Sequence, residues 1–234
     1  MVKQLLFRLA KSPGMGRLVG WAFRWCWWAI PVRKLVRSKR VLAFEHPRPA
    51  YQNHVILSPR GPVRDLLQMG EEKHTGCFQE IWQAVQTLAA TRPEYRQGFT
   101  LAANGGKRQE VGQVHFHLFT GHPLVSGTPA REEAGETLFC NDAVCIRLHP
   151  SPEWELHLVL CPAAPAAAFQ NSTATGIAKA TAEYLRAIPR ALAVLQSYFS
   201  ITEKGYSLVY QPNDTHTVLP AFHLIAGRKI RNSP

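Results

Sequence analysis

The residues with the clearest chemical potential lie in the stretch QVHFHLFTG at residues 113–121. Its apolar and polar residues alternate, which is typical of a β-strand with one buried face. This alternation places Gln113, His115 and His117 on the face opposite the apolar one. Neutral imidazoles can act as nucleophiles or carry protons near pH 7, and an amide can hydrogen-bond but cannot titrate there. We therefore expect a polar working surface on this strand.

A metal site is an alternative use of the same histidines. His115 and His117 lie two residues apart, and His54 could join them as a third ligand. The sequence places no carboxylate or thiol nearby to complete such a set. We therefore expect neither a metal nor another cofactor.

A weaker copy of the sequence pattern occurs near the other end of the chain. Residues 41–62 and 144–165 share eight identities at a constant offset of 103, most of them histidine and proline. Residues 98–121 likewise parallel residues 205–227 at an offset of 106 to 107. The sequence therefore contains two copies of one unit.

Helical sequence separates the paired blocks within each copy. We predict helices over Cys77 to Arg92 and from about Thr173 to Phe199, with Pro189 kinking or dividing the second. Each copy then consists of two strands, a helix and two more strands. This order predicts an α+β fold with an antiparallel sheet.

We assign the two units to residues 41–121 and 143–230, joined by a linker over 122–142 that is rich in Gly, Pro and charge. We expect their sheets to pair edge to edge about a pseudo-twofold axis, which would cover one exposed edge of each. Such pairing within one chain favours a monomer.

The positive charge is concentrated in an N-terminal arm, residues 1–40. The chain has a formal net charge of +11, and the arm holds ten Lys/Arg and no acid. From Val41 onward 17 Lys/Arg face 16 Asp/Glu. The nearly neutral body gives no reason to expect nucleic-acid binding.

The arm combines this charge with an aromatic, apolar run. The run from Leu18 to Val32 is shorter than the roughly 20 residues that a spanning helix needs. An amphipathic helix lying on the cytoplasmic surface of an anionic membrane fits its composition. A helix docked on a subunit of a membrane complex and a short tilted span are alternatives. The expected contact residues are Trp21, Arg24, Trp25, Trp27 and Trp28.

The five cysteines are odd in number and scattered, without a CxxC pair. We therefore expect reduced thiols and no disulfide framework. They are Cys26, Cys77, Cys140, Cys145 and Cys161.

Three segments together resemble the histidine-triad (HIT) family of nucleotide hydrolases and transferases: NHVILSPR, GFTLAANGG and QVHFHLF. The family signature is a strand of the pattern His-φ-His-φ-His-φ-φ, in which φ is apolar. Two tandem copies, one of them degenerate, resemble the branch of galactose-phosphate uridylyltransferase and diadenosine-polyphosphate phosphorylase. The resemblance covers residues 41–230 and leaves out the arm.

The resemblance implies a role for each matching residue. His115 would attack the α-phosphorus of a nucleotide and form a nucleotidyl-histidine intermediate, and His117 would assist the phosphate oxygens. His54 would support the pair from the neighbouring strand, and Asn104 would lie near the phosphate or ribose. Further donors and positive charge for phosphate would come from Gln113, Lys107 and Arg108.

Two positions depart from the family pattern. Gln113 replaces the first signature histidine, so proton transfer to a leaving group needs another residue. His46 stands where the family usually has an acid that binds the ribose hydroxyls. In the second copy, Ala221 replaces the nucleophile. We expect a membrane-associated nucleotidyl or phosphoanhydride hydrolase or transferase, or alternatively a scaffold or accessory subunit that has lost catalysis.

Overall fold

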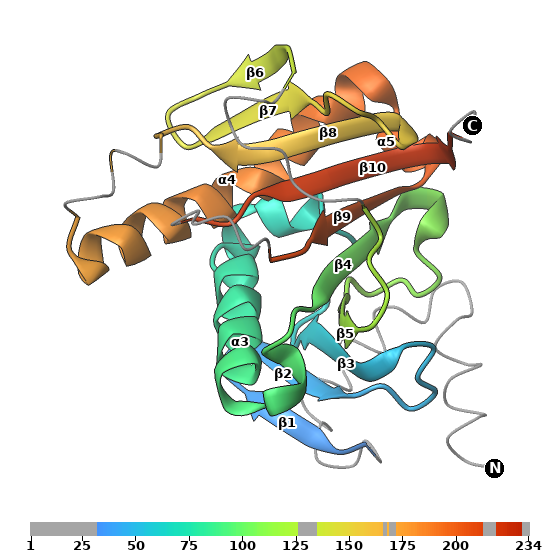
Figure 1. Cartoon of the computed structure of the whole chain (residues 1–234), viewed down its shortest axis with the longest axis vertical. Coiled ribbons are helices and arrows are strands. Elements are labelled where there is room, and N and C mark those ends of the chain that lie inside the picture. Colours follow the sequence, from blue (N-terminus) through green and yellow to red (C-terminus); the bar gives the residue numbers. More distant parts are fainter. Residues whose placement is uncertain (1–31, 126–134, 166–167, 169–171, 213–218, 231–234) are drawn as a thin grey trace.

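The computed structural model describes residues 32–125, 135–165, 168, 172–212 and 219–230. In this part of the chain, ten strands form one antiparallel sheet in the order β1-β2-β3-β5-β4-β9-β10-β8-β7-β6 (Figure 1). The predicted α+β class with a large antiparallel sheet is therefore confirmed. The expected contact residues of the arm, Trp21, Arg24, Trp25, Trp27 and Trp28, lie outside the described residues.

The first unit contributes five strands and one long helix. The helix has the predicted extent, because its apolar residues recur at helical spacing and are buried against the sheet. The elements are β1 (Lys34–Arg37), β2 (Val41–Glu45), β3 (Gln52–Pro59), η2 (Gln68–Gly70), η3 (Glu72–His74), α3 (Cys77–Thr91), η4 (Pro93–Tyr95), β4 (Thr100–Gly105), η5 (Gly106–Arg108) and β5 (Phe116–Thr120).

The second unit repeats this order. Its long helix runs through Pro189 undivided, so the prediction of a division there is wrong. The elements are β6 (Thr137–Cys140), β7 (Val144–Leu148), β8 (Trp154–Pro162), α4 (Ala174–Phe199), α5 (Ile201–Lys204), β9 (Tyr206–Tyr210) and β10 (Phe222–Lys229).

Two edge strands extend beyond the expected unit boundaries. β1 lies inside the segment 1–40 that the sequence assigned to the arm, and it pairs with β2. β6 lies inside the expected linker 122–142 and pairs with β7. Both strands are short and only partly buried, so they lack the strong apolar alternation that reveals a strand in a sequence.

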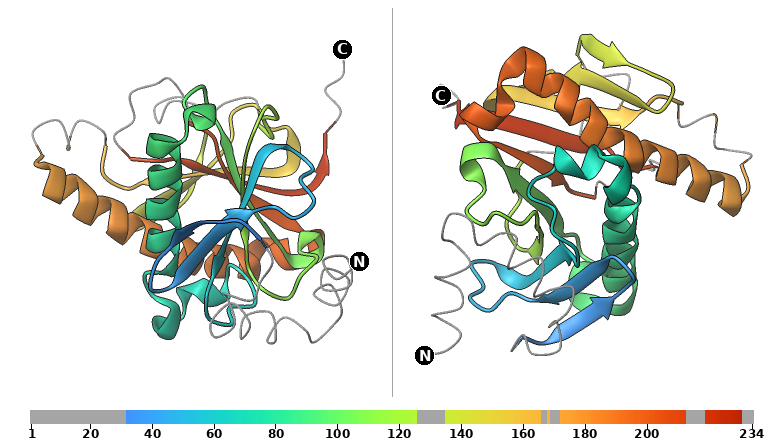
Figure 2. Two further views of the ribbon diagram at one scale, coloured as in Figure 1. Left: turned by 90° about the horizontal axis from the view of Figure 1, so that it is seen from below. Right: turned by 180° about the vertical axis from the view of Figure 1, so that it is seen from behind.

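The two faces of the sheet differ in what covers them. α3 and α4 pack on one face, where Phe116 and Leu118 of β5 join the main hydrophobic core (Figure 2). The opposite face carries a smaller apolar cluster that includes Ala102 and Phe119. His117 alternates with the core residues of β5, so it belongs to this opposite face.

The units meet through β4 and β9, which pair antiparallel at the centre of the sheet (Figure 1). At the end of this ladder Gly105 pairs with Tyr206, a fully buried residue. A Cβ on Gly105 would lie 2.1 Å from the Tyr206 ring. Glycine is therefore required here because the two units approach too closely for any side chain.

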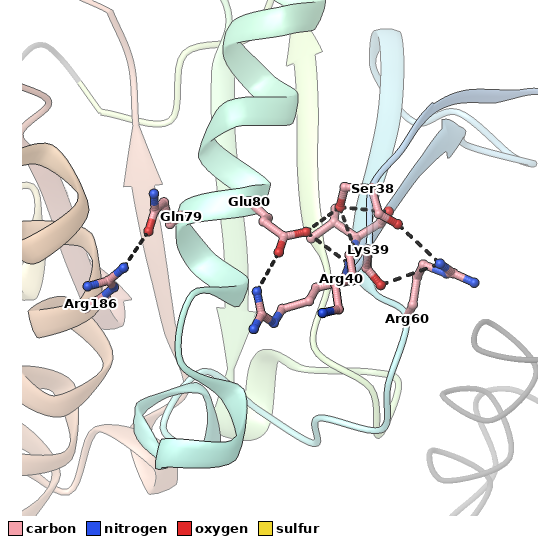
Figure 3. A network of polar contacts seen from close by, with 8 residues as sticks. Ser38, Lys39, Arg40, Arg60, Gln79, Glu80 and Arg186 are labelled. Atoms are coloured by element: carbon pink, nitrogen blue, oxygen red, sulfur yellow. Dashed lines mark hydrogen bonds and ion pairs between the residues drawn. The ribbon is translucent and has the colours of Figure 1, made fainter. Parts of the chain in front are cut away.

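A polar network fixes the β1–β2 hairpin to α3 (Figure 3). The Glu80 carboxylate accepts hydrogen bonds from the hydroxyl of Ser38 at 2.5 Å and from the guanidinium of Arg40 at 2.8 Å. Arg60 donates to the Ser38 carbonyl at 3.2 Å. A second contact in Figure 3, from Arg186 to Gln79 at 3.2 Å, links α4 to α3.

The expectation that all cysteines are reduced is wrong for one pair. Cys140 and Cys145 form a disulfide across the β6–β7 hairpin. They are directly paired in the ladder with their Cα atoms 4.1 Å apart, which brings their side chains together. Cys77 and Cys161 are buried thiols. No helix in the described part of the chain is both long and apolar enough to cross a membrane.

Candidate active site

His115 and His117 lie side by side where β5 begins. Their ring centroids are 4.8 Å apart, at an interplanar angle of 67°. Both residues are partly buried, at the face of the sheet opposite the helices. The predicted juxtaposition of these two imidazoles is therefore present.

The hydrogen bond of His115 defines its tautomer. Nδ1 lies 2.9 Å from the backbone carbonyl oxygen of Gln113. A carbonyl can only accept, so Nδ1 carries the proton and Nε2 carries the lone pair. His115 thus presents an unprotonated Nε2, which is the state that a nucleophile requires.

A chain of hydrogen bonds defines the tautomer of His117 in the opposite sense. The backbone N–H of Ala50 donates to Nδ1 of His54 at 3.3 Å, so the proton of His54 is on Nε2. This Nε2 donates to Nδ1 of His117 at 2.9 Å. His117 therefore keeps its own proton on Nε2, where it can be donated to a ligand.

Burial keeps these histidines neutral. It lowers the pKa of His117 to about 2 and that of His54 to about 3, with neighbouring imidazoles acting in the same direction. Burial also lowers the pKa of His115. The tautomers above therefore persist at pH 7.

His46 stacks on His54, with centroids 4.2 Å apart and an interplanar angle of 10°. Its Nδ1 accepts from the backbone N–H of Arg48 at 3.0 Å. The ring thus lies beside the His54–His117 pair, at the position where the family resemblance would put a ribose-binding acid. An imidazole with this Nδ1 occupied offers N–H donation instead of carboxylate acceptance.

Gln113 does not point its amide toward His115. Its Nε2 donates to the carbonyls of Pro59 and Gly61 at 3.1 and 2.9 Å, and its Oε1 accepts from the N–H of Val63 at 3.2 Å. The side chain is 2% exposed. Gln113 is thus bound to the loop after β3, and the expectation that it donates to a phosphate is not met in this geometry.

Arg108 also points elsewhere than expected. Its guanidinium reaches the second unit, donating to Ser207 Oγ at 3.2 Å and to the carbonyl of Gly227 at 2.5 Å. It also lies over the Trp154 ring, 4.6 Å from the centroid. Lys107, the other cation expected to bind phosphate, is exposed on η5.

Asn104 lies at the end of β4, on the same face as the histidines. The β4–β5 ladder ends with Ala103 paired to Phe116, and Asn104 and His115 each lie directly beyond this last pair. Ser207 donates to the Asn104 Oδ1 at 2.7 Å. Sequence reasoning identified Asn104 but missed Ser207, because a serine alternating with apolar residues in a strand carries no signal of its own.

The histidines also form groups in which a metal ion could be considered. Ligand atoms of His46, His54 and His117 lie within 4.8 Å of one another. In this arrangement Nε2 of His54 uses its proton to bond His117, so a metal would have to displace that hydrogen bond. His115, which the sequence placed in the metal alternative, is not a member of the group.

Together these features define a class of protein: two repeated α+β units that share one antiparallel sheet, with paired histidines on a signature strand of the first. Residues 29–124 match the HIT domain family model. This match covers the first unit, so the chain carries a HIT domain there, and the second unit lies outside the match.

Individual relatives fall into two groups by coverage. A HIT-like protein of 13.2 kDa from Azospirillum brasilense is 28% identical over 101 residues, covering 41% of this chain and 80% of its own. A GalT-like protein and an ADP-glucose phosphorylase with bound ADP-glucose, both from Arabidopsis thaliana, each cover 91% of this chain with a TM-score of 0.57. They are 10% and 8% identical to it and are covered to 83% and 82%, so they show the fold of the tandem arrangement.

Proposed function

We propose that the first unit is a nucleotidyl hydrolase or transferase that cleaves a phosphoanhydride through His115. The observation that carries this proposal is the opposite tautomers of two adjacent imidazoles. His115 offers a lone pair on Nε2, and His117 offers a proton on Nε2. A nucleophile beside a hydrogen-bond donor is the pairing that attack on a phosphoryl group needs.

The reaction follows from these two atoms. Nε2 of His115 attacks the α-phosphorus, and the bond from phosphorus to the bridging oxygen breaks. The phosphorylated ring becomes cationic and keeps its Nδ1 proton, which the Gln113 carbonyl continues to accept. The N–H of His117 stabilises negative charge on a phosphoryl oxygen. Water or an acceptor hydroxyl then attacks phosphorus and releases His115 as a neutral ring.

The substitution at Gln113 favours one class of leaving group. An amide cannot supply a proton, and here all of its polar atoms bind backbone. A phosphate leaves as a stable anion without protonation, whereas an alcohol or amine requires an acid. We therefore assign a substrate whose leaving group is itself a phosphate or phosphate ester, which includes diphosphate-linked nucleotide sugars.

The comparison with ADP-glucose phosphorylase supports a ligand of this class, since that protein holds a nucleotide sugar in the same fold. The HIT-domain match of the first unit supports hydrolase or transferase chemistry at a coarse level. Asn104 and Lys107 remain proposed phosphate contacts. For Gln113 and Arg108 we propose a positioning role instead, since their side chains are bound to backbone and to the second unit.

Trapping of the covalent intermediate tests this function. Full-length protein is mixed with ADP-glucose labelled at the α-phosphorus, quenched in alkali and mapped for a phosphoramidate. We expect one label per chain, on the peptide containing His115, and none in His115→Ala. His223→Ala, which changes the corresponding strand of the second unit, is the matched control and should label normally. If all three proteins show only background labelling, with ADP-glucose and also with ATP, the proposal is overturned. The result would then favour a scaffold without catalysis.

We also propose that the arm, residues 1–40, attaches the protein peripherally to the cytoplasmic surface of a membrane. Its charge and tryptophan content support this location. Wild-type protein should sediment with vesicles containing phosphatidylserine and not with neutral vesicles, and deletion of residues 1–30 should abolish this. Sedimentation of both proteins alike would contradict it.

We further propose that a pseudo-twofold axis relates the two units. The central register supports it, because Ala102 pairs with Val209 and Ala103 with Leu208 in antiparallel strands that occupy the same place in each unit.

A further inference from the structure

Asn104 is held by a directed chain of hydrogen bonds that starts at Arg108. The guanidinium of Arg108 can only donate, so Ser207 Oγ accepts from it at 3.2 Å. The hydroxyl proton of Ser207 is then available for Asn104 Oδ1, which lies 2.7 Å away. This order fixes the orientation of the Asn104 amide: Oδ1 faces Ser207, and the NH₂ group faces away from it.

The NH₂ group of Asn104 is available for a ligand. It makes no hydrogen bond to any residue in the described part of the chain. The β4–β5 ladder ends with Ala103 paired to Phe116, and Asn104 and His115 are the next residues beyond this pair on the two segments. We take this proximity to bring the amide toward a phosphoryl group that His115 attacks.

Contacts with the second unit fix the side chain of Arg108, where the chain of hydrogen bonds starts. Besides Ser207, Arg108 donates to the carbonyls of Ile225 and Gly227 on β10, at 3.5 and 2.5 Å. Its guanidinium also packs over Trp154 of β8. The partial burial of this side chain is thus compensated by contacts that come from the second unit.

The corresponding amide of the second unit is hydrogen-bonded to backbone. Gln211 occupies the place of Asn104 in the repeated sequence, and its Oε1 accepts from the N–H groups of Leu124 and Val125 at 2.8 and 3.1 Å. Its Nε2 donates to the carbonyl of Val125 at 3.1 Å. Both ends of Gln211 therefore bind backbone, whereas the NH₂ group of Asn104 makes no hydrogen bond to a described residue.

We infer that Ser207, a residue of the degenerate second unit, is a positioning residue for the active site of the first unit. It orients the Asn104 amide so that its N–H donors face the phosphoryl oxygens of the substrate. This inference rests on the proposed function. It gives the second unit a catalytic purpose even though that unit has Ala221 in place of a nucleophile.

A double-mutant cycle tests whether Ser207 acts through Asn104. The rate of adenylyl-His115 formation from labelled ADP-glucose is measured by rapid quench in Asn104→Ala, Ser207→Ala and the double variant. Loss of one preorganised donor costs about 100-fold, so we expect that effect for Asn104→Ala and about 10-fold for Ser207→Ala. The double variant should be no slower than Asn104→Ala. Effects that multiply would overturn the inference.

Two matched variants separate positioning from folding. Ser207→Thr keeps the hydroxyl and should restore the rate to within about 3-fold of wild type. Thr100→Val removes another buried hydroxyl, which donates to the His122 carbonyl at 3.2 Å on the same sheet, and should leave the rate unchanged. A rate loss in Thr100→Val equal to that in Ser207→Ala would show a general packing effect and contradict the inference.

A readout without substrate distinguishes failure of the inference from failure of the proposed function. In protein labelled with ¹⁵N-asparagine, the side-chain NH₂ signal of Asn104 is assigned from its absence in Asn104→Ala. Ser207→Ala should shift this signal, and Thr100→Val should not. No shift would overturn the hydrogen-bond chain itself. A shift in a protein that forms no adenylyl-histidine would leave the chain intact and reject the proposed function, and with it a catalytic purpose for Ser207.

Discussion

The two units carry nearly the same histidine cluster, yet they differ at the residue that could do chemistry. His54 bonds His117 at 2.9 Å in the first unit, and His157 bonds His223 at 3.0 Å in the second. The stacked partner repeats as well, since His149 lies on His157 with centroids 4.0 Å apart at 9°. Because the cluster recurs in the unit that has Ala221 in place of His115, the cluster can form without a nucleophile beside it.

The two units therefore differ in only a few atoms that could take part in a reaction. In the first unit His115 adds a lone pair, and Asn104 adds an amide donor just beyond the last pair of the β4–β5 ladder. In the second unit an alanine and a backbone-bound glutamine occupy the two places. Both units contain the histidine cluster, so the cluster does not distinguish them, whereas these two positions do.

Acidification should cause the largest loss of folding stability, because it acts on the histidine clusters that both units share. Folded-state pKa values are lowered to about 3 for His54 and His223, about 2 for His117 and about 4 for His157. The unfolded chain, with histidine pKa near 6.5, binds more protons below that pH, so stability is complete above pH 6.5 and falls as pH drops toward the folded values. One pH unit costs up to about 1.4 kcal/mol per buried histidine, so the sum reaches several kcal/mol at pH 5.5.

Urea denaturation at pH 7.5, 6.5 and 5.5 measures this loss of stability. The double variant His157→Gln/His223→Leu, which removes titrating groups from the second unit only, should lose less stability on acidification than wild type. Identical pH dependence of the two proteins would mean that the second cluster does not resist protonation as described.

Replacement of the histidine that accepts the hydrogen bond in each cluster, His117 or His223, separates the roles of the two clusters. His117→Ala and His223→Ala each leave a donor, Nε2 of His54 or of His157, without its partner. Both should be destabilised by about 1–3 kcal/mol, the usual cost of an unsatisfied buried group. Only His117→Ala should also slow adenylyl transfer, by about 100-fold, because it removes a donor to the phosphoryl group.

Stopped assays on the folded fraction, with stability measured in parallel, compare these two variants. Equal rate losses would contradict the distinction between a catalytic and a structural cluster. Equal stability losses with unequal rates would support it.

A smaller effect is expected where the units meet. Gly105→Ala forces a methyl group against the Tyr206 ring, 2.1 Å from where its Cβ would lie. Overpacking of a core typically costs about 1–3 kcal/mol, and we expect a loss of this size in thermal or urea unfolding. Gly176→Ala, near the start of α4, meets only ordinary contacts and should be neutral or stabilising. Tolerance of Gly105→Ala would show that the β4–β9 junction is looser than described.

Much of the architecture could be predicted because the two copies of the repeat share residues with strong preferences for particular local structures. Recurring prolines and histidines marked equivalent strands, and apolar periodicity marked α3 and α4 to within a residue. The pairing of His115 with His117 followed from strand alternation alone.

The remaining features depend on contacts that sequence spacing does not encode. Gln113 was expected on the working face, but its amide is instead bound to backbone groups at and after the end of β3. Arg108 was expected to bind phosphate, whereas its partners lie about 100 residues away in the other unit. The disulfide between Cys140 and Cys145 required the β6–β7 register, and β6 itself had been taken as linker.

The most direct measurement is the site and stoichiometry of the phosphoramidate formed from α-labelled ADP-glucose. The chemistry described here predicts one adenylyl group per chain, labile in acid, stable in alkali and carried by Nε2 of His115. Recovery of the label on a histidine of the second unit, or no label above that of His115→Ala, would contradict it.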